Sequence, residues 1–233
     1  MRLNVNHWSL KLFYLLLATD IVLIILHVIN IYTDLISNVS FSLATDGGYG
    51  ELFQYLKEYW IALLLCFVAV RKRSVLYLIW SLLFFYLLLD DSIQIHEKLG
   101  IRISNKLDFS TGLNLRAQDF GELVVSLVVS LSFFILIAIA YRFSDRQSKE
   151  ISKYLIIMLF TLAFFGIAVD LLHVVVKGSS FGTFFGIFED GGEQIVMSII
   201  AYFVFLLPER LQSDSNKLKI KSTFPERVLS KKL

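Results

Sequence analysis

The chain has 233 residues, 56% of them hydrophobic, and a mean hydropathy of +0.68. This composition excludes an ordinary soluble domain and indicates several apolar spans of roughly 20 residues, the length that crosses a bilayer as a helix. The formal net charge of +2 gives no indication of a nucleic-acid partner. A single cysteine, Cys66, excludes both an intramolecular disulfide and a CxxC redox or zinc motif.

The hydropathy pattern predicts an all-α, polytopic transmembrane bundle of about six helices. The first apolar run is too long for the core of a signal peptide, so we expect it to remain as a helix. Pro208 and Pro225 lie outside the spans, and no proline kink is expected. The predicted bundle covers residues 1–208 and a basic cytoplasmic tail covers 209–233. The expected spans are roughly 10–32, 52–70, 75–96, 119–141, 153–176 and 187–207.

The distribution of lysine and arginine predicts that both termini lie in the cytoplasm. Segments on that side would hold 16 of the 22 basic residues, and basic residues are enriched in cytoplasmic loops. The acidic loop 33–51 is then expected on the opposite side. The basic tail is expected either to be attracted to anionic headgroups or to be a solvated end.

Ionisable residues interrupt the outer half of all six spans. Counted at about 1.5 Å per residue, they lie about 18 to 28 Å from the cytoplasmic ends of their helices. Such groups are costly in a bilayer and normally face a bundle interior or cavity, so this polar layer indicates a functional site. Its members are Glu51, Glu58, Asp90, Asp91, Glu97, Asp119, Glu122, Asp170, Glu189, Asp190 and Glu193, with His27, His96 and His173.

The spacing within this layer places several pairs on one helix face, because residues three, four or seven apart are neighbours there. Asp170-x-x-His173 is the nearest analogue of the Glu-x-x-His pairs of di-metal carboxylate bundles. Further examples are Asp119 with Glu122, Asp190 with Glu193, and the stripes Glu51–Gln54–Glu58 and Asp90–Gln94–Glu97.

Carboxylate with imidazole suits a divalent metal such as iron, manganese or zinc. So many neighbouring carboxylates need cations or protons, and Lys57 is a candidate to neutralise one. Asp20, at a different depth, is expected to hydrogen-bond a neighbour. The predicted metal ligands are Asp90, Asp91, His96, Glu97, Asp170, His173, Glu189, Asp190 and Glu193, and Glu122 and Glu58 are the next candidates for ligands. The predicted catalytic residues are Asp91, Glu193 and Glu122.

Two other metal arrangements stay open at this point. His27, His96 and His173 could form a three-histidine zinc site with an activated water. Two of the histidines could instead ligate a haem. Gly178, Gly182 and Gly186 precede the last acidic segment, and they predict either a re-entrant element or a flexible loop.

The strings Asp90-Asp91-x4-His96-Glu97 and Glu189-Asp190-x2-Glu193 resemble those of a group of bacterial multi-span membrane proteins of unassigned function. Their strings read Asp-Glu-x4-His-Glu and Glu-Glu-x2-Glu, so the resemblance implies a shared site but no reaction. A looser similarity is to alkaline-ceramidase-type membrane hydrolases, which are seven-helix proteins with a three-histidine zinc site. The chain lacks their pair of histidines four residues apart.

The leading prediction is a bacterial inner-membrane enzyme, a metal-dependent hydrolase or oxidoreductase whose site opens to the periplasmic side. Its expected partners are membrane lipid and a lipophilic substrate. A cation- or proton-coupled transporter is one alternative, but polar residues are few in the cytoplasmic half, with Asp20 and Ser81 the examples. A structural or assembly subunit is the other alternative.

Overall fold

The computed structural model describes residues 7–107, 116–176 and 180–211, and the regular structure within them is helical. Six helical segments are long and apolar enough to cross a membrane, which confirms the predicted six-span bundle. Five of the elements are α1 (His7–Tyr32), α2 (Tyr49–Lys72), α3 (Val75–Ile93), α5 (Ala117–Phe143) and α8 (Ser180–Phe205). The remaining span runs from Arg146 to Val176 and combines α6 (Arg146–Ala163), the π-helical segment η2 (Phe164–Val169) and α7 (Asp170–Val176).

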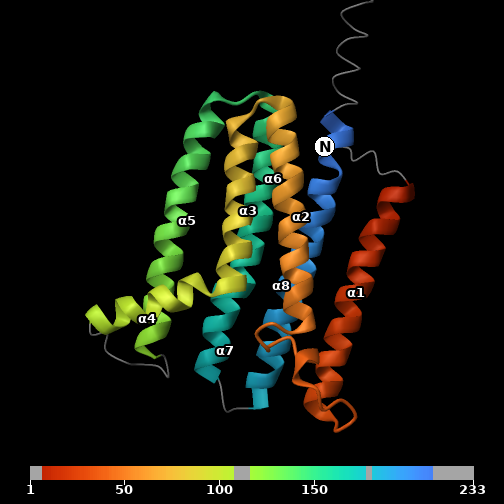
Figure 1. The fold of residues 1–233 in the computed structure, drawn as a ribbon, viewed down its shortest axis with the longest axis vertical. Helices are drawn as coiled ribbons and strands as arrows, with labels where there is room; N and C mark the ends of the chain where they lie inside the picture. Colours follow the sequence, from red (N-terminus) through yellow and green to blue (C-terminus); the bar gives the residue numbers. More distant parts are fainter. Residues whose placement is uncertain (1–6, 108–115, 177–179, 212–233) are drawn as a thin grey trace, which may run out of the picture.

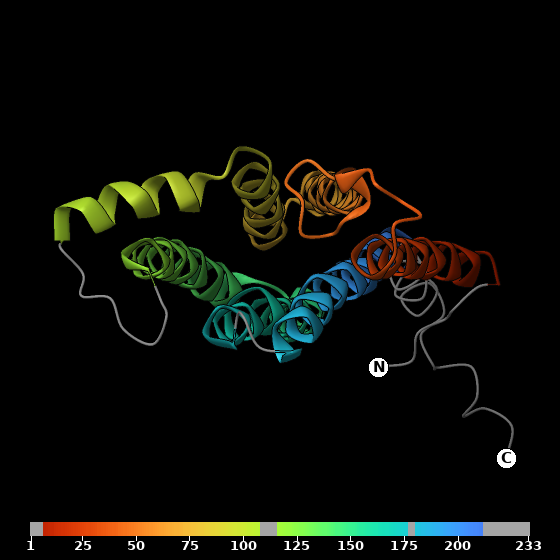
Figure 2. The same cartoon turned by 90° about the horizontal axis from the view of Figure 1, so that it is seen from below.

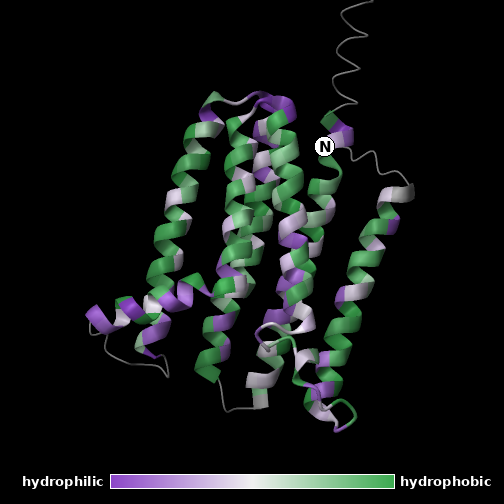
Figure 3. Ribbon diagram, viewed as in Figure 1, coloured by the Kyte–Doolittle hydropathy of each residue, from purple (hydrophilic) through white to green (hydrophobic). Residues whose placement is uncertain are grey.

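The helices form two layers (Figure 1). Seen along the bundle, α2 and α3 form one row, continued by the short helix α4 (Ile95–Leu107), while α5, α6–α7, α8 and α1 form the other (Figure 2). The start of α1, the end of α8 and the basic turns at 71–74 and 142–146 lie at one end. Polar residues gather at both ends of the bundle (Figure 3). At the end opposite the basic turns, they extend into the helices.

The core lies where α2, α3, α6 and α8 pack together. Trp80 and Met197 are fully buried there, and the Trp80 indole donates a hydrogen bond of 2.9 Å to Ser152 on α6. Ser81 donates a 2.7 Å bond to the carbonyl of Ala62, which ties α3 to α2. Packing and interhelical hydrogen bonds of this kind hold helices together in lipid. Few side chains of α1, α5 and the α6–α7 span are buried, and the apolar ones that are exposed form the surface that would face lipid.

The third span ends earlier than predicted, at Ile93. Gln94 adopts a left-handed conformation with φ of 54°, and α4 then crosses the end of the bundle (Figure 1). The Asp90 carboxylate accepts a 2.8 Å bond from the amide of His96, which satisfies a donor at the start of α4 as a capping residue does. The prediction that Asp90, Gln94 and Glu97 share one helix face is therefore wrong, because the chain turns between them.

A second irregularity lies within the fifth span. Six residues from Phe164 to Val169 form a π-helical segment directly before Asp170, and such segments are frequent at functional sites. A Cβ atom added to Gly166 would collide with the Glu193 carboxylate, and one added to Gly192 would collide with the Phe165 ring. The segment thus packs closely on α8 at the height of the acidic residues.

Two glycines bring α4 against α5. A side chain on Gly121 would meet the carbonyl of Gly100, and one on Gly100 would meet the backbone of Glu122. Close backbone approach through small residues is a common way to join helices in membranes.

Gly121→Ala is therefore expected to detach α4 from α5, because the added methyl group would meet backbone that cannot move aside. We expect the amides of α4 to lose most of their hydrogen-exchange protection, as measured by mass spectrometry. Gly191→Ala is the control, since its Cβ would meet only the end of the flexible Ile24 side chain at 3.2 Å. Equal protection of α4 in both variants would contradict this account.

Candidate metal centre and membrane cavity

Three side chains from the last two spans come together at the polar end of the bundle. Asp170 and His173 lie on α7 and Glu189 lies on α8, and one ligand atom from each lies within 4.8 Å of the others. His173 Nδ1 is 2.8 Å from the Glu189 carboxylate. Within the described residues this is the one group of three or more such side chains with that geometry. It could hold a metal ion.

The local structure explains how the His173 ring reaches α8. A Cβ atom on Gly186, one helical turn before Glu189, would lie 3.1 Å from Cε1 of the ring. The glycine therefore leaves room for the imidazole against the helix. Gly182 and Gly186 belong to α8 itself, whereas Gly178 lies outside the described residues. At Gly182 and Gly186 the chain forms neither the re-entrant element nor the flexible loop considered above.

The chemistry of the three donors fits a divalent cation. Two carboxylates and one imidazole suit zinc, iron or manganese, and three protein ligands leave a position for water or substrate. One carboxylate oxygen of Asp170 and one of Glu189 lie within 4.8 Å of each other. Two ionised carboxylates at this spacing repel each other, so the arrangement favours either a proton or a cation between them.

A second acidic pair lies on α2 and α3. Glu58 and Asp91 line the same cavity, and the Tyr55 hydroxyl donates a 3.0 Å bond to the Asp91 carbonyl. Glu193 lies on α8 one helical turn after Glu189, and it lines the same cavity as Glu58 and Asp91. Glu193 is therefore placed between the three-residue group and the second pair.

Asp90 and His96 form a third contact at the break between α3 and α4. Besides capping the His96 amide, the Asp90 carboxylate lies 3.0 Å from the His96 Nδ1. This hydrogen bond raises the pKa of His96 above its ordinary value. Asp90 thereby favours the protonated imidazole, and the pair is not part of the three-residue group.

Asp90→Asn is expected to lower the pKa of His96, because the neutral amide stabilises the imidazolium less than the carboxylate does. A folded-state pKa above the unfolded value means that this interaction stabilises the fold below the unfolded pKa. The stabilisation is lost as the pH rises through the folded pKa. Histidine-selective NMR titration would measure the shift, with Asp34→Asn, an exposed acid at the same end, as control. An unchanged His96 titration in Asp90→Asn would contradict the assignment.

A cavity of about 450 Å³ joins these polar groups to the apolar interior. Its walls come from α3, α5 and α6, and its polar end holds carboxylates from α2, α3 and α8. Sequence reasoning missed Tyr86, Ser126 and Ser130 in this lining; the two serines, four residues apart on an apolar span, were the available signal. The polar end comprises Gln54, Glu58, Asp90, Asp91, His96 and Glu193, and the walls include Leu83, Leu87, Leu123, Leu127, Phe133 and Leu159.

Other members of the predicted polar layer have local partners. Asp119 caps α5 and binds the guanidinium of Arg116 at 2.7 Å, while Glu122 accepts a 2.7 Å bond from Gln118. Glu51 accepts a hydrogen bond from the amide of Gly47. Burial raises the pKa of Glu97, which lies on α4 outside the three-residue group.

His27 binds the loop that follows α1. Its Nδ1 lies 3.0 Å from the amide of Leu43 and 3.2 Å from the hydroxyl of Ser42, and the residue is 2% exposed. Among the described residues, His27, His96 and His173 do not form a group with metal-ligand geometry. The three-histidine alternative therefore has no support from the positions of these rings.

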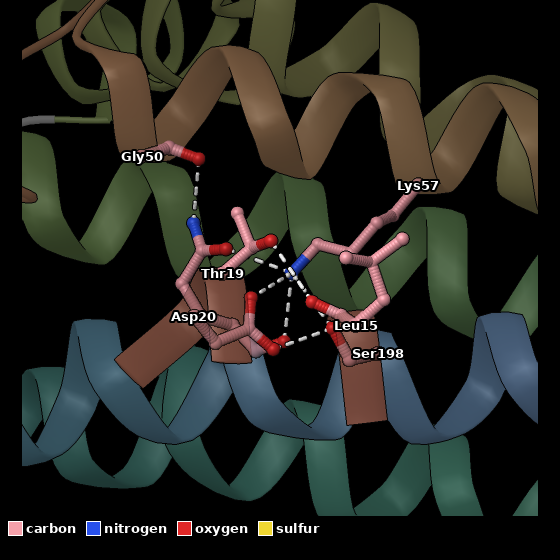
Figure 4. A network of polar contacts seen from close by, with 7 residues as sticks. Leu15, Thr19, Asp20, Gly50, Lys57 and Ser198 are labelled. Atoms are coloured by element: carbon pink, nitrogen blue, oxygen red, sulfur yellow. Dashed lines mark hydrogen bonds and ion pairs between the residues drawn. The ribbon is translucent and has the colours of Figure 1, made fainter. Parts of the chain in front are cut away.

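Lys57 lies in a separate buried network (Figure 4). Its ammonium group is 3.0 Å from Asp20, 2.7 Å from the Gln194 side-chain oxygen and 3.3 Å from Ser198, and Ser198 donates a 2.5 Å bond to Asp20. Lys57 and Asp20 are both 0% exposed. Lys57 thus pairs with Asp20 and not with the acidic layer. Gln194 and Ser198 were missed in the sequence, although their i,i+4 spacing on an apolar helix was a signal.

Two residues of this network are adjacent in the sequence to residues that line the cavity. Lys57 precedes Glu58 on α2, and Gln194 follows Glu193 on α8. The bonds of 2.7 and 2.8 Å from Lys57 to Gln194 therefore fix the register of α2 against α8. That register directs both Glu58 and Glu193 to the cavity.

The chain belongs to the family whose model is described as "Domain of unknown function (DUF8692)". The model matches residues 12–207, which contain four spans in full, most of the first and last spans, and the acidic groups. No curated protein and no solved structure matches the chain.

Proposed function

We propose that this protein is a metal-dependent enzyme that acts on a lipid or another lipophilic substrate. One observation carries the proposal: a cavity with apolar walls ends at carboxylates, and one of them, Glu193, lies one helical turn after Glu189 of the group that could hold a metal ion. Apolar pockets with a few convergent polar groups are the usual form of small-molecule sites. The basic turns at 71–74 and 142–146 support a cytoplasmic location for that end and a periplasmic location for the site, in a bacterial inner membrane.

Asp170, His173 and Glu189 would hold the ion. A divalent ion bound there would act as a Lewis acid. It would either activate a bound water or polarise an oxygen atom of the substrate. Glu193 lines the cavity one helical turn after Glu189 of this group, so it is the proposed general base. Asp91 lines the same polar end of the cavity and is proposed to assist Glu193 in proton transfer. The α5 wall would hold the apolar part of the substrate.

Lipid turnover tests this function. Purified wild type, loaded with zinc, iron or manganese, and the variants His173→Ala and Glu193→Gln would each be incubated with a bacterial lipid extract. We expect mass spectrometry to show a lipophilic compound that the wild type consumes and both variants leave intact. Asp34→Asn should behave as wild type. Identical lipid profiles for wild type and His173→Ala would contradict the proposed activity.

Cation- or proton-coupled transport is a second candidate, and the Asp20–Lys57–Ser198 network favours it. The network lies one residue from Glu58 and from Glu193, so ionisable groups continue beyond the cavity. Transport through this path would stop in the double variant Asp20→Leu/Lys57→Met in liposomes. The enzyme account predicts that the same variant retains lipid turnover.

A further inference from the structure

Two buried oxygen atoms on α2 have no hydrogen-bond partner and belong to residues that line the cavity. They are Oε1 of Gln54 and Oε2 of Glu58, and the two residues are 7% and 1% exposed. The residues are four apart, so they share one face of the helix. Buried acceptors are nearly always paired in folded proteins, so two unpaired acceptors on residues that line one cavity point to a hydrogen-bond donor there, either a ligand or an ordered water.

The charges around these acceptors select the kind of donor. Glu58, Asp90, Asp91 and Glu193 surround the polar end, and among the described lining residues His96 is the one side chain able to become cationic. His96 is already bound to Asp90. A phosphate or carboxylate headgroup would find no free positive partner here, whereas a cation would be attracted by the summed negative charge.

Lys57 does not supply that cation, although it precedes Glu58 in the chain. Its ammonium group is held by Asp20, Gln194 and Ser198, at distances of 2.7 to 3.3 Å. It lies outside the cavity lining. The lining therefore keeps an excess of acceptors and of negative charge.

The remainder of the cavity suits a hydrocarbon chain. Its walls carry leucine, valine, isoleucine and phenylalanine from α3, α5 and α6, with Ser126 and Ser130 as the polar exceptions on α5. Two of these helices, α5 and α6, also contribute to the lipid-facing surface of the bundle. An amphiphile could thus place its chain along α5 and its headgroup against α2.

We propose that the cavity binds an amphiphile with a primary ammonium headgroup, and that Gln54 and Glu58 accept its N–H bonds. A primary ammonium offers three hydrogen-bond donors and a positive charge, so it can donate to both unpaired acceptors at once. A trimethylammonium group has the charge without donors, and an alcohol has a donor without the charge. This inference rests on the proposed function and names the class of its lipophilic substrate.

Photolabelling with three alkyl probes tests the inference. The probes share one chain with a terminal diazirine and differ in the headgroup: primary ammonium, trimethylammonium or phosphate. Each is incubated with chelator-treated protein in nanodiscs, and peptide mass spectrometry measures labelling of α5. We expect the ammonium probe to label the cavity-facing side of α5 about tenfold more than the phosphate probe, the size expected from hydrogen bonds to a charged group.

Glu58→Gln and Gln54→Leu should each reduce labelling by the ammonium probe, while Asp34→Asn should not. Equal labelling by all three headgroups, or equal labelling by the ammonium and trimethylammonium probes, would overturn the inference. So would unchanged labelling in both cavity variants.

The design separates this inference from the proposed metal function. Photolabelling of chelator-treated wild type and of His173→Ala does not require a metal ion at Asp170, His173 and Glu189. Selective labelling in protein that never binds metal would support the headgroup site and contradict the enzyme. A protein that binds metal but shows no selective labelling would contradict the headgroup site and leave the proposed metal-dependent function standing.

Discussion

Lys57→Met is expected to destabilise the bundle by about 3–5 kcal/mol, because it leaves the buried Asp20 carboxylate with Ser198 as its remaining hydrogen-bond partner. Removal of one member of a buried ion pair is costly, since the other charge stays desolvated. Asp20→Leu alone should have an effect of the same order by leaving the ammonium group without its counter-ion. Retention of folded protein after heating, measured by size-exclusion chromatography in detergent, would report both losses.

The double variant Asp20→Leu/Lys57→Met provides the decisive comparison. Replacing both charges by apolar side chains is often neutral, so we expect it to recover most of the stability lost in either single variant. Gln194 keeps its 2.7 Å bond to the carbonyl of Gly50, which preserves one link between α8 and α2. Additive losses in the double variant would mean that the two side chains act independently, contrary to the network in Figure 4.

Bound zinc, iron or manganese is expected to stabilise the wild type strongly. A free metal concentration of about 1,000 times the Kd would add about 4 kcal/mol to the free energy of unfolding. Asp170→Asn and His173→Ala should lose this increment because each removes one of three ligands. Thermal unfolding with a metal series and with chelator would measure it, and Asp34→Asn should respond as wild type does.

The change in stability that Asp170→Asn causes in the absence of metal distinguishes a metal-binding site from a purely structural cluster. In chelator, Asp170→Asn removes one of two neighbouring carboxyl groups, so it should leave stability unchanged or raise it. A structural role that only pairs α7 with α8 predicts a loss of stability in chelator and no response to metal. That pattern would assign the group to helix pairing and the protein to an assembly role.

The sequence predicts the six spans because each requires a long apolar run, and such runs are local features. It also places Asp170 next to His173, since residues three apart share a helix face. The partner Glu189 belongs to the same predicted layer, although the sequence does not indicate which of the nearby acids would meet His173. Gly186 settles this choice by leaving space for the ring beside Glu189.

The features that the sequence does not predict depend on contacts between distant segments. The left-handed turn at Gln94 is held by its 2.8 Å bond to Asp46, which comes 48 residues earlier. The π-helical segment at Phe164–Val169 fits against Gly192 and Glu193 of another span. Lys57 pairs with Asp20 because α1, α2 and α8 meet at that depth, and no local pattern specifies this register.

The metal content of the purified protein tests the central claim most directly. Elemental mass spectrometry would compare wild type with His173→Ala, and with Asp34→Asn as the control. The account predicts about one zinc, iron or manganese ion per chain in wild type and Asp34→Asn, and its loss in His173→Ala. Wild type without stoichiometric metal, or His173→Ala with the wild-type content, would contradict the metal centre at Asp170, His173 and Glu189.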